Sequence, residues 1–250
     1  MKQLMRYRII SGRTTEVRDV LMEVGGTRRP RGHKTGKSSA KQLERNEAEA
    51  VRVLARELNC NCEGGWLFLT LKYTDERLPL TVEEGERLVK NFIRRLARIY
   101  KKLTGKKLVY FWANGERSSK TGKPCRLHHH LVLPPMDWET IAEHWPADQF
   151  SYRRLDATGD YTGIARYMIK NAGYGNGKRA WKNSTGIKKP VYTKPIPVNR
   201  AGGVRVPPEV RIVEREVREN EESGFSASYT RWVAPMQTNA QRHGRRRRSE

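Results

Sequence analysis

Apolar and polar positions recur along the middle of the chain with two periods, one typical of helices and one typical of strands. Residues 39–59 and 88–99 carry apolar side chains three and four positions apart, which predicts two amphipathic helices. Ser39 and Thr81 each have a Gln or Glu three residues later, as in a capping box at a helix start. Three further runs favour strands, because they are rich in apolar and aromatic residues: "WLFLTLKY", "KLVYFWA" and "RLHHHLVL".

The order of these elements predicts a fold class. "FSYRRL" reads as a fourth strand after a short helix over residues 137–145, and "DYTGIARYMIKN" reads as a last helix. From residue 66 the order is therefore β-α-β-β-α-β plus one helix, which is the order of the ferredoxin-like split βαβ unit. We expect an α+β protein with a central antiparallel sheet, in which the first and third strands lie in the middle.

The two ends of the chain differ from this middle part in composition. Residues 1–37 are rich in Arg, Gly and Thr and predict a basic arm with one early strand, whereas residues 38–195 contain the predicted core. Residues 196–250 predict a basic, partly disordered extension that ends in "RHGRRRRSE". "AGYGNGKR" has the loose shape of a phosphate loop, but it lacks the Ser or Thr after the Lys and follows a helix, so we reject a nucleotide site.

Charge narrows the class of partner. The 250 residues include 50 Lys and Arg against 27 Asp and Glu, a formal charge of +23, which favours nucleic acid as the partner. No apolar run approaches the roughly 20 residues of a membrane span, and no apolar signal-peptide core follows the start. Cys60, Cys62 and Cys125 have neither a zinc-ribbon spacing nor an even count, so we expect reduced thiols in a cytoplasmic protein.

Three consecutive histidines lie in the third predicted strand. Because side chains alternate along a strand, His128 and His130 share one face, about 7 Å apart by strand rise, and can bind one cation. His129 faces the other, apolar side and reads as structural. Glu116 lies before the hairpin turn and is the candidate third ligand, in a set that suits Mg²⁺ or Mn²⁺. The alternative is that the histidines pair with helix groups or only cap the sheet.

The last helix contains a tyrosine away from its apolar face. Tyr167 and Lys170 lie three residues apart and off the apolar arc, with Gly163 near them. A phenol with an ammonium on the same side suits attack on a phosphate, with the Lys offsetting negative charge. A single Y-x-x-K spacing is also frequent by chance, and an ordinary tyrosine at a helix edge is the competing interpretation.

The combination of motifs resembles the HUH endonucleases, specifically the rolling-circle replication initiators. An apolar-His-x-His-apolar strand precedes a Y-x-x-K helix by about forty residues, in the family's motif order. "FLTLKY" is similar to the initiators' first motif strand, and "NFIRRLARIYKK" to the helix ahead of their hairpin. "NSTGIKKP" is similar to a segment after the tyrosine in replication-associated proteins of bacterial mobile elements, although Thr185 and Gly186 depart from that pattern. The resemblance covers about residues 38–195.

This resemblance implies a reaction and a role for each candidate residue. Tyr167 would be the nucleophile that cleaves single-stranded or hairpin origin DNA, leaving a 5′-phosphotyrosine link and a free 3′-OH. Lys170 would be the auxiliary cation. His128, His130 and Glu116 would bind Mg²⁺ or Mn²⁺. A host helicase and polymerase would be partners, because a chain of this length has no room for a helicase domain.

Two other functions remain open at this point. A single-tyrosine transposase of the same superfamily would have the same motifs and chemistry. A non-catalytic nucleic-acid-binding protein on a ferredoxin-like sheet would explain the charge, with no special role for Tyr167. Tyr174, seven residues after Tyr167, is a candidate second nucleophile, as found in some initiators.

Overall fold

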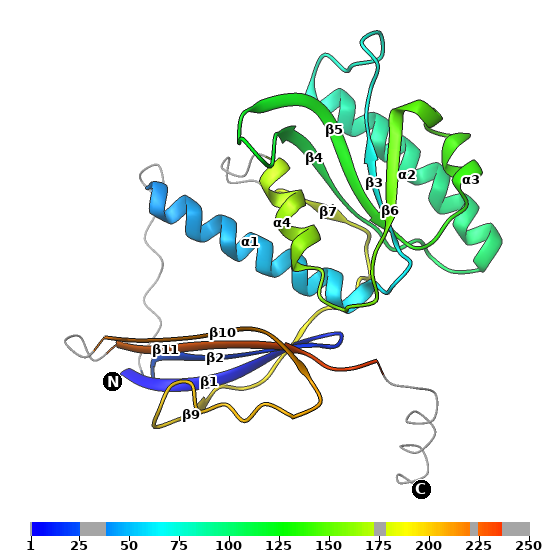
Figure 1. Cartoon of the computed structure of the whole chain (residues 1–250). Helices are drawn as coiled ribbons and strands as arrows, with labels where there is room; N and C mark the ends of the chain where they lie inside the picture. The colour runs from blue at the N-terminus through cyan, green and yellow to red at the C-terminus, as the bar shows by residue number, and fades with distance from the viewer. Residues whose placement is uncertain (1, 26–38, 173–178, 221–224, 237–250) are drawn as a thin grey trace, which may run out of the picture. The chain divides into compact units, whose positions relative to one another are not determined.

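The computed structural model describes residues 2–25, 39–172, 179–220 and 225–236, and it divides into two compact units. Unit 1 combines Met1–Lys34 with Pro190–Glu250, and unit 2 is the continuous segment Thr35–Lys189. The chain is an α+β protein with two antiparallel sheets, one in each unit, and the described residues contain four α-helices, all in unit 2 (Figure 1). No helix among the described residues is long and apolar enough to cross a membrane.

Unit 2 contains the elements that the sequence predicts, in the predicted order. Its helices and strands are α1 (Ala40–Asn61), β3 (Leu67–Leu71), α2 (Val82–Thr104), β4 (Phe111–Arg117), β5 (Pro124–Leu133), α3 (Trp138–Ala142), β6 (Phe150–Arg154), α4 (Thr162–Asn171) and β7 (Lys182–Asn183). The strands pair in the order β6-β3-β5-β4-β7, so the first and third predicted strands are central, as expected. A 3₁₀ turn, η1 (Ala147–Gln149), leads into β6.

The two capping boxes begin helices where predicted. Ser39 Oγ accepts a hydrogen bond from the Gln42 amide at 3.3 Å, and Thr81 Oγ1 accepts one from the Glu84 amide at 3.1 Å. The second predicted strand starts later than expected, at Phe111 instead of Lys107. The reason is that Tyr110 exchanges hydrogen bonds with Ser184 instead of continuing the regular strand pairing.

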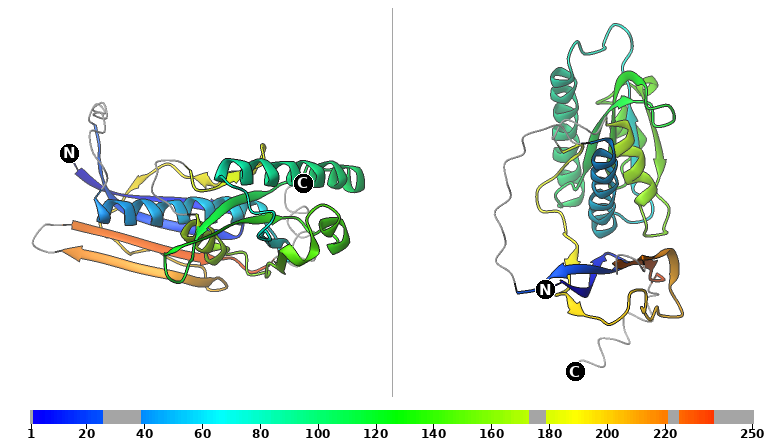
Figure 2. Two further views of the ribbon diagram at one scale, coloured as in Figure 1. Left: turned by 90° about the horizontal axis from the view of Figure 1, so that it is seen from above. Right: turned by 90° about the vertical axis from the view of Figure 1, so that its left-hand side faces the viewer.

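The sheet of unit 2 is covered on both faces, which explains the nearly continuous apolar run of β3. Leu67, Leu69 and Leu71 lie in the core on the α2 face, and Phe68 lies in the core under α1 and α4. Figures 1 and 2 show α1 and α4 on one face of this sheet and α2 on the other. The α1 and α4 face carries His128 and His130.

Unit 1 differs from the predicted arm and extension. Its strands are β1 (Lys2–Ser11), β2 (Thr14–Glu23), β8 (Val191–Tyr192), β9 (Ile196–Pro197), β10 (Arg211–Asn220) and β11 (Phe225–Val233). They pair in the order β10-β11-β2-β1-β8, with β9 also paired to β1, so the described parts of the two chain ends form one sheet. The predicted disordered tail after residue 236, like Tyr174, lies outside the described residues.

Asp19 of β2 lies at the centre of this second sheet. The Arg6 guanidinium donates to its two oxygens at 2.7 and 2.9 Å, and the Gly202 amide and the Ser228 hydroxyl donate at 2.8 and 2.7 Å. Burial alone would raise the pKa of Asp19, but these hydrogen bonds outweigh it and hold the pKa below its usual value. One carboxylate therefore links β1, β2, β11 and the segment before β10.

Candidate active site

Strand β5 brings His128 and His130 together on one face, as the alternation of side chains predicts. Their Nε2 atoms are 3.1 Å apart and their ring centroids 4.8 Å apart. In the neighbouring strand β4, Ala113 lies opposite His130 and Gly115 lies opposite His128. A Cβ atom at Gly115 would overlap the His128 ring, so the glycine leaves the space that this imidazole occupies. The two rings therefore meet because the facing residues on β4 are small.

Backbone and side-chain groups fix the orientation of both rings. His128 Nδ1 lies 2.9 Å from the Arg126 carbonyl oxygen, which can only accept, so this nitrogen carries the proton in the neutral ring. His130 Nδ1 lies 3.2 Å from the Thr70 hydroxyl. Phe68 stacks on the His130 ring, with centroids 5.3 Å apart. These contacts hold the Nε2 atoms towards each other, as outer contacts of metal-binding histidines do.

His130 is fully buried, and its environment favours the neutral imidazole. Burial is the largest cause, followed by His128, and together with smaller effects they lower the pKa of His130 to about 3. A hydrogen bond with Asn171 acts in the opposite direction and is outweighed. Only the neutral ring has a lone pair to give to a metal ion. His130 therefore keeps its metal-binding form throughout the physiological range.

The donor set fits one divalent cation in part. A separation of 3.1 Å between two Nε2 atoms is close to that of two adjacent ligands on an ion bound at about 2.1 Å. Among the described residues, however, no group of three His, Cys, Asp or Glu side chains is arranged to hold a metal. The histidines supply two nitrogens, and the remaining positions would fall to water or to phosphate oxygens of a substrate.

Glu116 is not brought into a group with the two histidines. The pairing of β4 and β5 becomes irregular between Gly115 and Arg117, so the residue opposite His128 is Gly115. Glu116 lies near Cys125, whose thiol pKa is raised first by desolvation and then by the Glu116 charge. The Cys125 sulfur is 4.0 Å from His128 Nδ1, on the side of the ring away from Nε2. The metal-ligand role of Glu116 thus remains a prediction without support from this geometry.

Helix α4 places Tyr167 against the histidine pair. Its ring centroid is 4.9 Å from that of His130 and 5.8 Å from that of Phe68, and the residue is 37% exposed. Ala165, Met168 and Ile169 of the same helix are fully buried, as the helical periodicity predicts. The phenol is therefore held at the sheet surface and is still accessible from solvent.

Lys170 and Asn171 complete the end of this helix. Lys170 is exposed, three residues after Tyr167, as predicted. The buried Asn171 amide donates to the Tyr167 carbonyl at 2.8 Å, and so links the tyrosine's backbone to a side chain that also bonds with His130. The C-terminal turn of α4 is thereby tied to the histidine strand.

His129 faces the α2 side, as expected of a structural residue. Its Nε2 is 2.7 Å from the Tyr73 hydroxyl and its Nδ1 is 3.0 Å from Asn114 Oδ1. The Asn114 amide in turn donates to Glu86 at 3.2 Å. Burial is the main cause that lowers the pKa of His129 to about 3. The middle histidine is therefore a neutral, fully bonded core residue on the opposite face from the candidate site.

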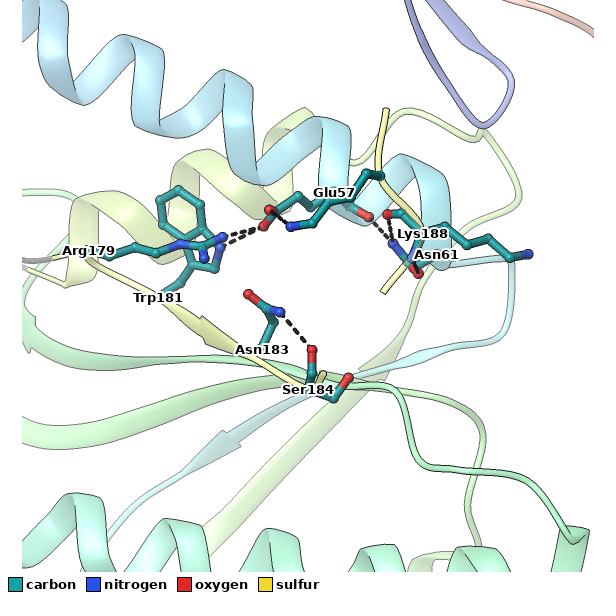
Figure 3. Close-up of polar contacts among 8 residues, drawn as sticks. Glu57, Asn61, Arg179, Trp181, Asn183, Ser184 and Lys188 are labelled. Carbon is teal, nitrogen blue, oxygen red and sulfur yellow. Dashed lines mark hydrogen bonds and ion pairs between the residues drawn. The ribbon is translucent and has the colours of Figure 1, made fainter. Parts of the chain in front are cut away.

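The segment after α4 is anchored to the end of α1 by Glu57 (Figure 3). The two oxygens of this nearly buried carboxylate accept from Arg179 at 2.6 Å, from Trp181 at 2.9 Å and from Lys189 at 2.8 Å. Asn61, one turn further along α1, exchanges hydrogen bonds with the backbone of Lys188. Arg179 ends the rejected phosphate-loop segment, and its guanidinium is paired with Glu57; residues 173–178 of that segment lie outside the described residues.

Several residues of the site were missed by sequence reasoning. Phe68 and Thr70 lie in the "FLTLKY" run, whose apolar character indicates a buried strand and hides its contacts with His130. Gly115 and Asn171 have no local pattern that marks them. The only sequence signal for these residues is the predicted strand order, which puts β3 next to the histidine strand.

The part of the chain that carries this site is similar to known replication proteins. A family profile described as replication-associated protein ORF2 matches residues 66–172, a segment that runs from β3 to the end of α4 and contains His128, His130, Glu116, Tyr167 and Lys170. Searches of curated proteins and of solved structures found no match. Over this segment the chain is similar to replication-associated proteins, which supports a replication initiator family.

Proposed function

We propose that the chain initiates rolling-circle replication by nicking single-stranded origin DNA through metal-assisted tyrosine transesterification. The observation that carries the proposal is the convergence of His128 and His130, 3.1 Å apart at Nε2, with the ring of Tyr167 4.9 Å from that of His130. The strand order β6-β3-β5-β4, with α2 and α3 as the connecting helices, supports a ferredoxin-like HUH core. The likeness of residues 66–172 to replication-associated proteins supports the biological role.

Tyr167 is the proposed nucleophile because it combines access with a fixed position. Its phenol oxygen would form a bond to the scissile phosphorus, and the bond from phosphorus to the 3′ oxygen would break. The phenol loses one proton and the departing 3′ oxygen gains one, so the products are a 5′-phosphotyrosine link and a free 3′-OH. The covalent link retains the phosphodiester energy for later religation, and the 3′-OH can prime a host polymerase after a host helicase unwinds the duplex.

His128 and His130 are the proposed metal-binding residues. A bound Mg²⁺ or Mn²⁺ would polarise the scissile phosphate and offset its growing negative charge. Thr70, Phe68 and the Arg126 carbonyl keep the two imidazoles in position. A third contact from Glu116 would require the irregular end of β4 to rearrange when DNA binds.

The first test is trapping of the covalent adduct. The protein is mixed with a library of stem-loop oligonucleotides and Mn²⁺, separated on a denaturing gel, and the adduct is mapped by mass spectrometry. We expect a DNA-modified peptide containing Tyr167. The variant Tyr167→Phe should form no adduct and cleave nothing, while it still binds DNA.

The matched control is Tyr152→Phe, because Tyr152 is similarly exposed at 42% but lies on β6. This variant should form the adduct normally. An adduct on Tyr161 instead of Tyr167 would assign the reaction to a different tyrosine. Nicking without any adduct would make water the nucleophile, and the absence of both across the library would favour a nucleic-acid-binding protein without catalysis.

A further inference from the structure

The cations around the candidate active site have no acidic partner in the part of the chain that the structure describes. Arg153 and Arg154 of β6 and Arg166 and Lys170 of α4 are all exposed, and none forms an ion pair with a described Asp or Glu. On the opposite face of unit 2, by contrast, Lys90 and Lys182 both pair with Glu86. Charge near the tyrosine is therefore free to meet an external anion.

Arg153 differs from the other three cations because it contacts the aromatic cluster of the site. It lies on the edge strand β6 directly opposite Phe68, and its guanidinium carbon is 5.1 Å from the centre of that ring. The same Phe68 ring contacts both His130 and Tyr167. Arg153 is thus separated by one side chain from the proposed metal-binding histidine and from the proposed nucleophile.

The contact with Phe68 leaves the hydrogen-bonding edge of the guanidinium available. An Arg plane that lies over a ring loses some freedom but keeps its N–H groups, which form a fork that matches two oxygens of a phosphate. Its positive charge also acts on the buried His130 ring, where it is a minor cause of the low pKa. A cation placed in this way suits a phosphate that has to lie within reach of the site.

We propose that Arg153 binds a backbone phosphate of single-stranded DNA next to the phosphate that Tyr167 attacks. This inference rests on the proposed function, since it assigns the path of the same strand. It makes β6 one wall of that path, with the strand running over Phe68 towards Tyr167. Arg154 lies on the other face of β6, opposite Leu67, and takes no part.

The test compares Arg153→Ala with Arg154→Ala, both in the Tyr167→Phe background so that no cleavage occurs. The probe is fluorescein-labelled dT20 with one central 5-iododeoxyuridine, and its binding is followed by fluorescence anisotropy over a series of NaCl concentrations. Arg153→Ala should raise the Kd about tenfold, the effect of one charge-assisted hydrogen bond, and reduce the salt slope by about 0.7. Arg154→Ala should change the Kd less than twofold, and Arg153→Lys should recover part of the loss.

Two further readings make the result decisive. Photocrosslinks to the peptide containing residue 167 should be lost in Arg153→Ala and kept in Arg154→Ala, and the melting temperatures of all variants should agree. Equal effects of the two Ala variants, or unchanged crosslinking in Arg153→Ala, would overturn the inference. A fall in melting temperature that accounts for the lost binding, without recovery in Arg153→Lys, would also overturn it. Adduct formation by the wild-type chain tests the proposed function separately.

Discussion

Gly115 is the residue on which the histidine pair most directly depends. Any side chain there would meet the His128 ring, which would have to turn away from His130. We therefore expect Gly115→Ala to reduce Mn²⁺-dependent cleavage as strongly as His128→Ala, while the melting temperature changes little, because His128 is only half-buried. Cleavage of a stem-loop substrate under single-turnover conditions measures the effect.

Gly163→Ala provides a matched control for this change. Gly163 lies on α4 near Tyr167, and a Cβ atom there would have no neighbour within 4 Å. The control variant should cleave normally and gain slightly in stability, because Ala is the better helix former. Full activity in Gly115→Ala would show that the reaction does not need the two imidazoles in the observed arrangement.

Lys170 should assist the reaction without being essential. It is exposed and lies on the same side of α4 as Tyr167, so its charge can stabilise the phosphate in the transition state. We predict that Lys170→Ala slows adduct formation by about 10²–10³-fold, by analogy with the loss of one oxyanion donor. Lys170→Arg should recover most of the rate, whereas an unchanged rate in Lys170→Ala would exclude Lys170 from the reaction.

The single-residue features that depend on local periodicity could be predicted from the sequence. The shared face of His128 and His130 follows from the period of a strand, and the exposed position of Tyr167 follows from the period of a helix. Glu116 was expected beside His128 on the assumption of a regular hairpin, and the irregular pairing after Gly115 removes that assumption. Phe68 and Thr70 could not be assigned, because their contacts depend on the register of β3 with β5.

At the scale of elements, α2 is held at its start by side chains on both sides of the cap. Thr81 Oγ1 accepts from the Glu84 amide, and Glu84 Oε2 accepts from the Leu80 amide, both at 3.1 Å. We predict that Thr81→Ala lowers the free energy of unfolding of unit 2 by about 1 kcal/mol. Urea denaturation measures this change. Thr81→Ser should retain most of the stability, and equal stability of all three proteins would show that the cap contributes nothing.

The elements of unit 2 were predictable because each carries its own local signal. Caps, turns and apolar periods mark α1, α2, β3 and β5, and short connections restrict how they can pair. The start of β4 was predicted too early, because the contact of Tyr110 with Ser184 joins residues that are 74 positions apart. Such a contact leaves no pattern in either segment.

At the scale of the whole molecule, the strands of unit 1 come from segments that are far apart in the sequence. Alternating charged and apolar residues, as in "VRIVEREVREN", are compatible with a helix or a strand, and their actual partner β11 pairs in turn with β2. Local composition therefore predicted a basic arm and extension where long-range pairing forms a sheet. The stability of that sheet should depend on Asp19, since this carboxylate links its segments.

The folded-state pKa of Asp19 is lowered, so its contribution to stability is complete above an unfolded-state pKa of about 4 and disappears as the pH falls through the lower folded value. Asp19→Asn should cost about 2 kcal/mol at pH 7 and much less near pH 2. Labelling with 5-fluorotryptophan gives the measurement, because Trp232 is the one tryptophan of six in unit 1. Its ¹⁹F signal in urea reports unit 1 alone.

Glu216→Gln is the control for this experiment. Glu216 is also a carboxylate of unit 1, but it is exposed and pairs only with Arg218 among the described residues. Its replacement should leave the Trp232 unfolding curve unchanged at both pH values. A difference between wild type and Asp19→Asn that stays constant from pH 7 to pH 2 would contradict the assigned role of the charge.

The pairing of β2 with β11 also sets an order of events during synthesis. Asp19 and Ser228 are 209 positions apart, so at about 5–20 residues per second the ribosome needs at least ten seconds to deliver the second neighbour of β2. All of unit 2 is made in that interval. A nascent chain that has just passed Lys189 would already hold the histidine strand and the tyrosine helix, while the edge of its first hairpin still waits for a partner and is exposed to pairing with another chain.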